Sequence, residues 1–233
     1  MDQSTPSAVN RLPVSRLVAH CFIAYFTLSV LKGIWLPTLM ENRLLFLAFD
    51  ITAFCVIPVF LLSMLWRRFD VRPHVYVRKT AAADWPWMLG VATFAAVAGH
   101  CLYRVGSAIG QWTGDRIPDL MPLQISYQSV EFFGWAHWVY VVYLAVTAGV
   151  VEELFYRGMV RRVAEELLPA RWSKLGFVIG SSLIFALIHW HTGLPNMAGC
   201  FTFGLLFAGI YLEFDDLRPL IVAHIGLDFW YFS

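Results

Sequence analysis

The sequence predicts an all-α fold, a polytopic transmembrane helical bundle with about seven spans. Of its 233 residues, 59% are hydrophobic and only 14% are charged, and the mean hydropathy is +0.63. Soluble domains of this size are far less apolar. Several apolar runs reach the ~20 residues that a helix needs to cross a bilayer. The 16 Gly and 11 Pro residues lie mainly at the ends of these runs, as expected for helices joined by loops.

Seven apolar segments follow a short polar tail at residues 1–16. A longer polar stretch, residues 106–133, is expected to form an external loop that holds a short interfacial helix. The fourth span is expected to continue as an amphipathic helix as far as Pro169. A six-span count, with the last segment re-entrant, remains an alternative. The expected spans lie at residues 17–39, 44–66, 86–103, 134–169, 175–189, 194–212 and 220–232.

The distribution of Lys and Arg predicts the orientation in the membrane. With the N-terminus inside, 13 of the 17 Lys and Arg residues fall on the inner side of the seven spans. Cytoplasmic loops carry such an excess, so we expect a cytoplasmic N-terminus and seven spans that contact the lipid bilayer. The formal net charge of +1 leaves no basic footprint, so we expect no nucleic-acid partner.

Charged side chains and histidines occur on three of the last four expected spans. Such groups are expensive to place in a membrane and are functional candidates by default. Three pairs with a spacing of four residues hold five of them, and each pair lies on one face of its helix. These pairs are Glu153 with Arg157, Phe185 with His189, and His224 with Asp228.

The doublet of Glu152 and Glu153 follows a run without a charge, from Trp138 to Val151. Neighbouring residues of a helix point about 100° apart, so Glu152 can face a cavity while Glu153 neutralises Arg157. If the fourth and fifth spans form a hairpin, Glu152 and His189 come to similar heights in it. The sequence therefore predicts that a carboxylate and a histidine meet inside the bundle.

These groups suit the hydrolysis of a peptide bond without a covalent enzyme intermediate. A carboxylate in an apolar site can act as a general base toward water near neutral pH. A histidine beside it can orient that water, and a His–Asp pair can stabilise negative charge that develops on oxygen. We expect no cofactor. A His-Glu-x-x-His motif is absent from the sequence, yet two Glu and two His could form a metal site, so a metal-dependent protease is an alternative.

Several residues also have a structural interpretation. A Glu–Arg pair near a helix end can be an interfacial ion pair, and an intramembrane His can be a hydrogen-bonded packing residue. His191, in a turn, is expected to be interfacial. Asp50 is a candidate structural partner for Lys32, and Gly204 with Ala208 indicates a close helix-packing surface. The four cysteines, none of them in a Cys-x-x-Cys pair, are expected to be buried packing residues.

Three motifs occur in order on apolar helices: Glu152-Glu153-x-x-x-Arg157, Phe185-x-x-x-His189 and His224-x-x-x-Asp228. In these motifs the chain resembles the CAAX-protease and bacteriocin-processing (CPBP, also called Abi) family of intramembrane endopeptidases. The resemblance covers residues 134–233, including the linking stretch 204–212. It implies two regions: an N-terminal transmembrane region with three spans and a loop, residues 1–133, and an intramembrane protease core, residues 134–233.

The resemblance implies a glutamic-type intramembrane protease that cleaves a membrane-anchored protein or peptide. Eukaryotic prenyl-protein members of the family carry Asn where this chain has Asp228. An ionised Asp cannot donate a hydrogen bond to an oxyanion, so Asp228 would have to be protonated or to orient His224. The roles implied by the motifs are activation of water by Glu152, support by Glu153 and Arg157, orientation of that water or of the glutamate by His189, and oxyanion stabilisation by His224 with Asp228.

Bacterial members of the family are linked to peptide maturation, bacteriocin self-immunity and the processing of membrane-anchored proteins. By analogy, we expect an integral protein of a bacterial cytoplasmic membrane. The alternative from another functional class is a non-enzymatic membrane protein of the same fold, such as a transporter or an immunity or scaffold protein. In that case Lys32 and Asp50, in the N-terminal region, would matter more than the motif residues.

Overall fold

The computed structural model describes residues 14–69, 84–117, 134 and 136–233, and these residues form helices without a strand. The predicted all-α fold is therefore confirmed. Three predictions fall outside the described residues: the polar tail before residue 14, the basic stretch with Arg72, Arg78 and Lys79, and the interfacial helix expected in the part of the loop at 118–133.

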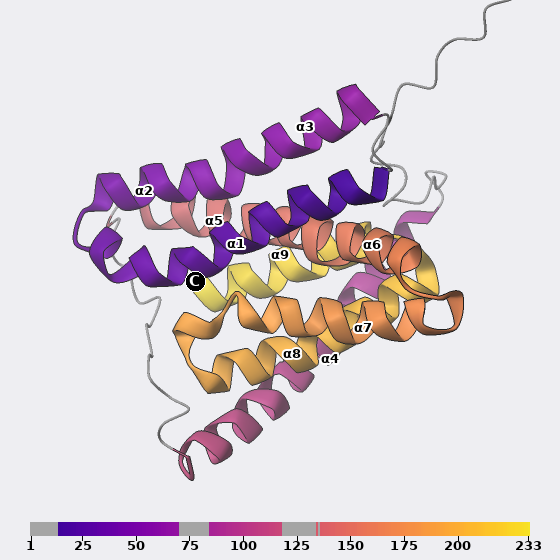
Figure 1. The fold of residues 1–233 in the computed structure, drawn as a ribbon. Helices are drawn as coiled ribbons and strands as arrows, with labels where there is room; N and C mark the ends of the chain where they lie inside the picture. The colour runs from indigo at the N-terminus through magenta and orange to yellow at the C-terminus, as the bar shows by residue number, and fades with distance from the viewer. Residues whose placement is uncertain (1–13, 70–83, 118–133, 135) are drawn as a thin grey trace, which may run out of the picture.

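The described part of the chain consists of seven continuous helical rods (Figure 1). Two rods contain a π-helical segment, and a single 3₁₀ turn, η7 (Trp190–Thr192), joins α7 to α8. The rods are α1 (Val14–Met40), α2–η1–α3 (Arg43–Ile51, Thr52–Val56 and Ile57–Phe69), α4 (Trp85–Gly114), α5–η6–α6 (His137–Glu152, Glu153–Met159 and Val160–Leu167), α7 (Ala170–Leu187), α8 (Leu194–Phe214) and α9 (Arg218–Phe232).

Five of these rods are long and apolar enough to cross a membrane, and the chain is an integral membrane protein. They are the rods of α1, α2–α3, α4, α5–α6 and α8. The helices α7 and α9 occupy the fifth and seventh expected spans but are not among the five. With 15 residues, α9 extends only ~22 Å, whereas a bilayer core is ~30 Å thick.

Helix α4 is longer than the sequence predicted. The loop was expected to begin at residue 106, but α4 continues to Gly114, so this part of the loop prediction is wrong. The cause is a close contact with α8. A Cβ atom at Gly106 would lie 2.5 Å from the Ala198 carbonyl oxygen, and one at Gly110 would lie 2.7 Å from the Leu194 carbonyl oxygen. Glycine lets the two backbones approach, and this packing keeps the end of α4 helical.

Helix α9 packs against both α5 and α4. Its side chain His224 is buried, whereas Trp230 near its end is exposed. The helix α8 packs against α4 and α7, and α6 packs against α7. A Cβ atom at Gly204 would meet Ser182 on α7 at 3.0 Å, so the predicted close packing surface on α8 is confirmed at this residue.

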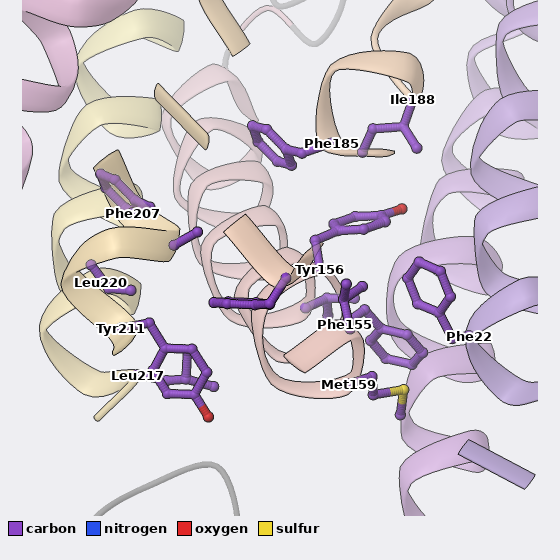
Figure 2. Close-up of a cluster of buried hydrophobic side chains, with 14 of the residues drawn as sticks. Phe22, Phe155, Tyr156, Met159, Phe185, Ile188, Phe207, Tyr211, Leu217 and Leu220 are labelled. Atoms are coloured by element: carbon purple, nitrogen blue, oxygen red, sulfur yellow. The ribbon is translucent and has the colours of Figure 1, made fainter. Parts of the chain in front are cut away.

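Aromatic side chains connect α1 to the π-helix η6. Figure 2 shows Phe22 of α1 beside Phe155 and Tyr156 of η6, and the ring centroids of Tyr25 and Phe155 are 4.2 Å apart. These side chains are buried. In another part of the same core, the ring centroid of Phe207 lies 3.9 Å from that of Phe203 and 6.1 Å from that of His224. The hydrophobic core thus surrounds the helix that carries the two adjacent glutamates.

We predict that Gly149→Ala destabilises the protein, although alanine is the better helix former by about 1 kcal/mol. A Cβ atom at residue 149 would lie 2.6 Å from Ile225 Cγ1 and 3.0 Å from the Ile225 backbone nitrogen. Helix α9 must then shift away from α5, at a cost of about 1–3 kcal/mol. Thermal unfolding in detergent measures the effect. The control Gly90→Ala, where a Cβ atom would meet nothing within 4 Å, should be neutral or stabilising, and a raised Tm for Gly149→Ala would contradict the close contact.

Candidate active site

The π-helix η6 places the two glutamates of the doublet in different surroundings. Glu152 is the last residue of α5, and Glu153 is the first of η6. In a π-helix the backbone bonds run from i to i+5, which changes the facing of the residues that follow, and such segments occur frequently at functional sites. The Ser181 hydroxyl of α7 donates a hydrogen bond of 2.7 Å to the Tyr156 carbonyl oxygen. This bond to the backbone of η6 fixes the π-helical segment against α7.

Glu153 and Arg157 form a fully buried ion pair. Arg157 Nη1 lies 3.2 Å from Glu153 Oε1, and neither side chain is exposed. The guanidinium group also stacks over the Phe185 ring, 4.2 Å from its centroid, in a cation–π contact that strengthens when desolvated. The pairing that the spacing predicted is therefore present, and Phe185 has a role in it that the sequence did not reveal.

Glu153 also contacts His224. The Nδ1 atom of His224 lies 2.8 Å from Glu153 Oε1, and because a carboxylate only accepts, this nitrogen donates its hydrogen. The opposite nitrogen, Nε2, lies 3.9 Å from Glu152 Oε2 and 3.7 Å from Asp228 Oδ2. These two separations are too long for direct hydrogen bonds and have the length at which a bridging water is considered.

His189 lies just after the last turn of α7. Its Nδ1 atom is 2.8 Å from the Phe185 carbonyl oxygen, four residues earlier. Since a carbonyl oxygen accepts, Nδ1 carries the hydrogen and Nε2 is left as the acceptor of the ring. The Phe185 ring touches both histidines, with centroid separations of 5.0 Å to His189 and 6.0 Å to His224. Phe185 thus separates and orients the two imidazoles.

A cavity of about 470 Å³ opens at this place. Four of the six predicted site residues line it, namely Glu152, His189, His224 and Asp228. The other two, Glu153 and Arg157, do not line the cavity, and their side chains have no exposed surface. The structure therefore separates the doublet as the helical rotation predicted: Glu152 faces the cavity, and Glu153 faces the ion pair.

The comparison with known protein families agrees with this geometry. Residues 134–230 match the family model described as type II CAAX prenyl endopeptidase Rce1-like. This part of the chain is Rce1-like. The family is one of intramembrane CAAX proteases, so the resemblance predicted from the motifs is confirmed. No match was found among curated proteins or among solved structures. Helices α1 to α4 lie outside the residues that match the Rce1-like family.

The sequence did not identify several polar residues of the cavity in and around the Rce1-like region. A chain of hydrogen bonds runs from the Tyr103 hydroxyl to Asn196 Oδ1 (2.6 Å), from Asn196 Nδ2 to Thr192 Oγ1 (2.5 Å), and from Thr192 Oγ1 to the His189 carbonyl oxygen (2.6 Å). It fixes the turn that follows His189. A polar Asn in the first turn of an apolar span was the available signal.

The prediction that His191 is an interfacial turn residue is wrong. Its exposed fraction is 3%, and it lines the cavity. Burial, followed by the nearby His189 and Lys32, lowers the pKa of His191 to about 3, so this ring is neutral at pH 7. The turn is buried because α1 covers it: Trp190 Nε1 donates to the Val30 carbonyl oxygen at 3.1 Å.

The four cysteines are free thiols. The predicted burial is confirmed for Cys21 and Cys200 and is wrong for Cys55, which is intermediate, and for Cys101, which is exposed. Cys200 lines the cavity. Among the described residues, no group of three or more His, Cys, Asp and Glu side chains is arranged to hold a metal ion. The metal-dependent alternative is therefore a matter for experiment.

We predict that Arg157→Met destabilises the protein by about 3–5 kcal/mol, because it leaves the Glu153 charge buried without its cation. Arg162→Met is the matched control on the same rod. Its ion pair with Glu166 has the same spacing of four residues but is partly exposed, so its loss should cost at most about 1 kcal/mol. Unfolding by heat or denaturant in detergent compares the two. Equal losses for both variants would show that the buried pair does not support the fold.

Proposed function

We propose that the chain is an intramembrane endopeptidase that hydrolyses a peptide bond of a membrane-associated protein or peptide with water activated by Glu152. One observation carries this proposal: Glu152 and the Nε2 side of His224 face the same cavity, while Glu153 holds the opposite nitrogen of His224 from behind. Glu152 could then act as a base toward water, and His224 could donate a hydrogen bond to the carbonyl oxygen of the same peptide bond as that oxygen becomes negatively charged.

In the proposed reaction, Glu152 takes a proton from water as the water oxygen attacks the carbonyl carbon of the scissile bond. The carbonyl oxygen becomes an oxyanion, and His224 Nε2, when protonated, donates a hydrogen bond to it. Glu152 then gives its proton to the amide nitrogen. The C–N bond breaks, and the products are a carboxylic acid and an amine. No covalent enzyme intermediate forms, and Glu152 ends as it began.

His189 would orient the water. Because the Phe185 carbonyl holds the Nδ1 hydrogen of His189, Nε2 can accept a hydrogen bond from the water that Glu152 deprotonates. A fixed water lies in a near-attack position more often than a free one. Glu153 and Arg157 act indirectly, through His224. They hold the His224 ring and do not touch the substrate, so they are positioning residues.

Asp228 is proposed to act as a protonated donor to the oxyanion. Two roles were open from the sequence: orientation of His224, or donation in the protonated form. Glu153 already binds the Nδ1 atom of His224 at 2.8 Å, whereas Asp228 lies 3.7 Å from Nε2. Because Glu153 already orients His224, this difference supports donation of a hydrogen bond from Asp228 to the oxyanion. The Asp228 carboxyl group and His224 Nε2 would then bind the oxyanion from the same part of the cavity.

The proposed substrates reach the cavity from the bilayer. The family that residues 134–230 match is one of CAAX prenyl endopeptidases, and we propose the wider class of membrane-anchored proteins or peptides as substrates of this chain. We also propose a bacterial cytoplasmic membrane with the N-terminus on the cytoplasmic side, which the excess of Lys and Arg on that side supports.

Glu152→Gln and His189→Ala are each predicted to lower the cleavage of a membrane-tethered peptide by purified protein, on the order of 10²–10⁴-fold, because acid–base and water-orienting groups contribute this much. The control Glu166→Gln, on the surface of α6 and paired with Arg162, should keep the wild-type rate. Mass spectrometry of the products after reconstitution into vesicles provides the rate and the cleavage site.

Full activity in both Glu152→Gln and His189→Ala would remove the proposed mechanism. Two further measurements separate the alternatives. Loss of activity with a chelator, together with stoichiometric metal in the pure protein, would indicate a metalloprotease. Flux of a solute or proton that survives Glu152→Gln, without any peptide cleavage, would indicate a transporter of the same fold.

Asp228→Asn should retain cleavage within about tenfold, because an amide donates a hydrogen bond to the oxyanion without needing a proton. Asp228→Leu removes the donor and should reduce kcat by about 10²–10³-fold. The pH profile of the cleavage rate distinguishes the roles. In the wild type, deprotonation of Asp228 and deprotonation of His224 each lower the rate as the pH rises, whereas in Asp228→Asn only the fall that comes from His224 should remain. A variant Asp228→Leu as active as Asp228→Asn would contradict a donor at this position.

A further inference from the structure

A second charged pair lines the same cavity. Lys32 on α1 and Asp50 on α2 lie with Lys32 Nζ 3.5 Å from Asp50 Oδ1, and their side chains are 10% and 1% exposed. Both residues lie on rods that can cross the membrane, and both line the cavity that holds Glu152. The predicted partnership of the two residues is confirmed. Charged groups at such depth are expensive and mark functional sites.

This pair is not a tight structural bridge. Charge-assisted hydrogen bonds between an ammonium group and a carboxylate are usually about 2.7–2.9 Å long, which is shorter than the 3.5 Å found here. The second oxygen, Asp50 Oδ2, is buried and has no hydrogen bond of normal geometry among the described residues. The Tyr143 hydroxyl interacts with the Asp50 carboxylate, and because each carboxylate oxygen has two lone pairs, Oδ2 can still accept a further hydrogen bond. Asp50 therefore keeps a buried acceptor in the wall of the cavity, and such an acceptor is costly unless a ligand satisfies it.

The Lys32 ammonium group lies over the Phe54 ring, 4.1 Å from its centroid. Lys32 lines the same cavity as Glu152 and His189, so it belongs to the surroundings of the proposed reaction centre. Phe54 belongs to η1, the π-helical segment that begins two residues after Asp50. The pair thus stands beside a π-helix, as Glu152 stands beside η6, and π-helical segments occur frequently at functional sites.

A peptide that is cleaved inside a membrane protein must leave its helical form near the scissile bond. Its N–H and C=O groups then lose their internal partners, and in an apolar setting each unsatisfied group costs several kcal/mol. The enzyme has to supply replacement partners in the cavity. An acceptor beside a donor, with no net charge, matches the N–H and C=O groups that one residue of an extended chain presents on the same side.

We propose that Lys32 and Asp50 form a subsite that binds the main chain of the extended substrate next to the scissile bond. Asp50 Oδ2 accepts a hydrogen bond from a peptide N–H group, and Lys32 Nζ donates one to a peptide carbonyl oxygen. This inference rests on the proposed protease function and deepens it. The ligand class is an uncharged peptide backbone, so the subsite positions the substrate without selecting a charged side chain.

Peptides with a single N-methyl group test the subsite, because N-methylation removes one backbone donor at a chosen position. Binding is measured in the Glu152→Gln background, by the Kd of fluorescent membrane-tethered peptides methylated in turn at each amide around the cleavage site. Methylation at one of these amides should weaken binding about tenfold, because it removes one hydrogen bond to a charged group. In addition, the double variant Lys32→Met with Asp50→Leu should reduce this penalty to less than twofold.

The double variant removes both charges at once, so that no lone charge is left buried. If it does not fold, two other double variants replace it, each with Lys32→Met: Asp50→Asn keeps an acceptor oxygen and should keep the penalty, whereas Asp50→Ala should lose it. The matched control is Arg161→Met with Asp215→Leu, which removes an ion pair between α6 and the end of α8, away from the cavity lining. This control should keep the full tenfold penalty.

Three results would overturn the subsite. The first is an equal N-methyl penalty with and without the pair, which would leave Lys32 and Asp50 a structural bridge between α1 and α2. The second is a double variant that keeps the N-methyl penalty but no longer binds a peptide with a free C-terminus differently from one with an amidated C-terminus. Lys32 would then be a binding site for the C-terminal carboxylate of the peptide. The third is the absence of any sensitive amide. Cleavage by the wild-type protein, abolished by Glu152→Gln, tests the protease function separately, so the two failures are distinguishable.

Discussion

The site depends on the contacts that the Glu153 carboxylate makes with His224 and Arg157. The Oε1 atom of Glu153 lies 2.8 Å from His224 Nδ1 and 3.2 Å from Arg157 Nη1. One oxygen atom thereby joins η6 to α9 and neutralises a guanidinium group that no solvent reaches. Because the Nδ1 side of His224 is held in this way, its Nε2 side can only face Glu152, Asp228 and the cavity. A buried acid with two partners is stable, whereas the loss of either partner would leave an uncompensated charge.

The helices that precede the Rce1-like region complete its site. The Tyr156 hydroxyl of η6 donates to Ser29 Oγ on α1 at 3.0 Å. The backbone of α1 also accepts a hydrogen bond from Trp190, directly after His189. A Cβ atom at Gly33 would lie 2.8 Å from both Trp190 and His191, so α1 presses closely on this turn. Helix α1 thus holds the glutamate segment and the histidine turn in one relative position.

The polar groups of the bundle are concentrated around one cavity, and this is how an apolar membrane protein can hold them. The Lys32–Asp50 pair reaches the cavity from α1 and α2, and Glu152 reaches it from α5. Charged groups scattered over separate lipid-facing sites would each carry the full cost of desolvation. Within one cavity they can share water and compensate one another, and the proposed peptide substrate would find partners for its exposed backbone there.

The sequence alone determined the helical fold, the approximate spans and the rotation that separates Glu152 from Glu153, because these follow from apolar length and from the period of the helix. It could not show that His224 binds Glu153, that His191 is buried, or that Lys32 and Asp50 share the cavity of Glu152. Those contacts join residues on different helices. They depend on how closely helices such as α5 and α9 approach at Gly149, which only the tertiary structure decides, because packing distance and tilt between helices have no periodic signal in the chain.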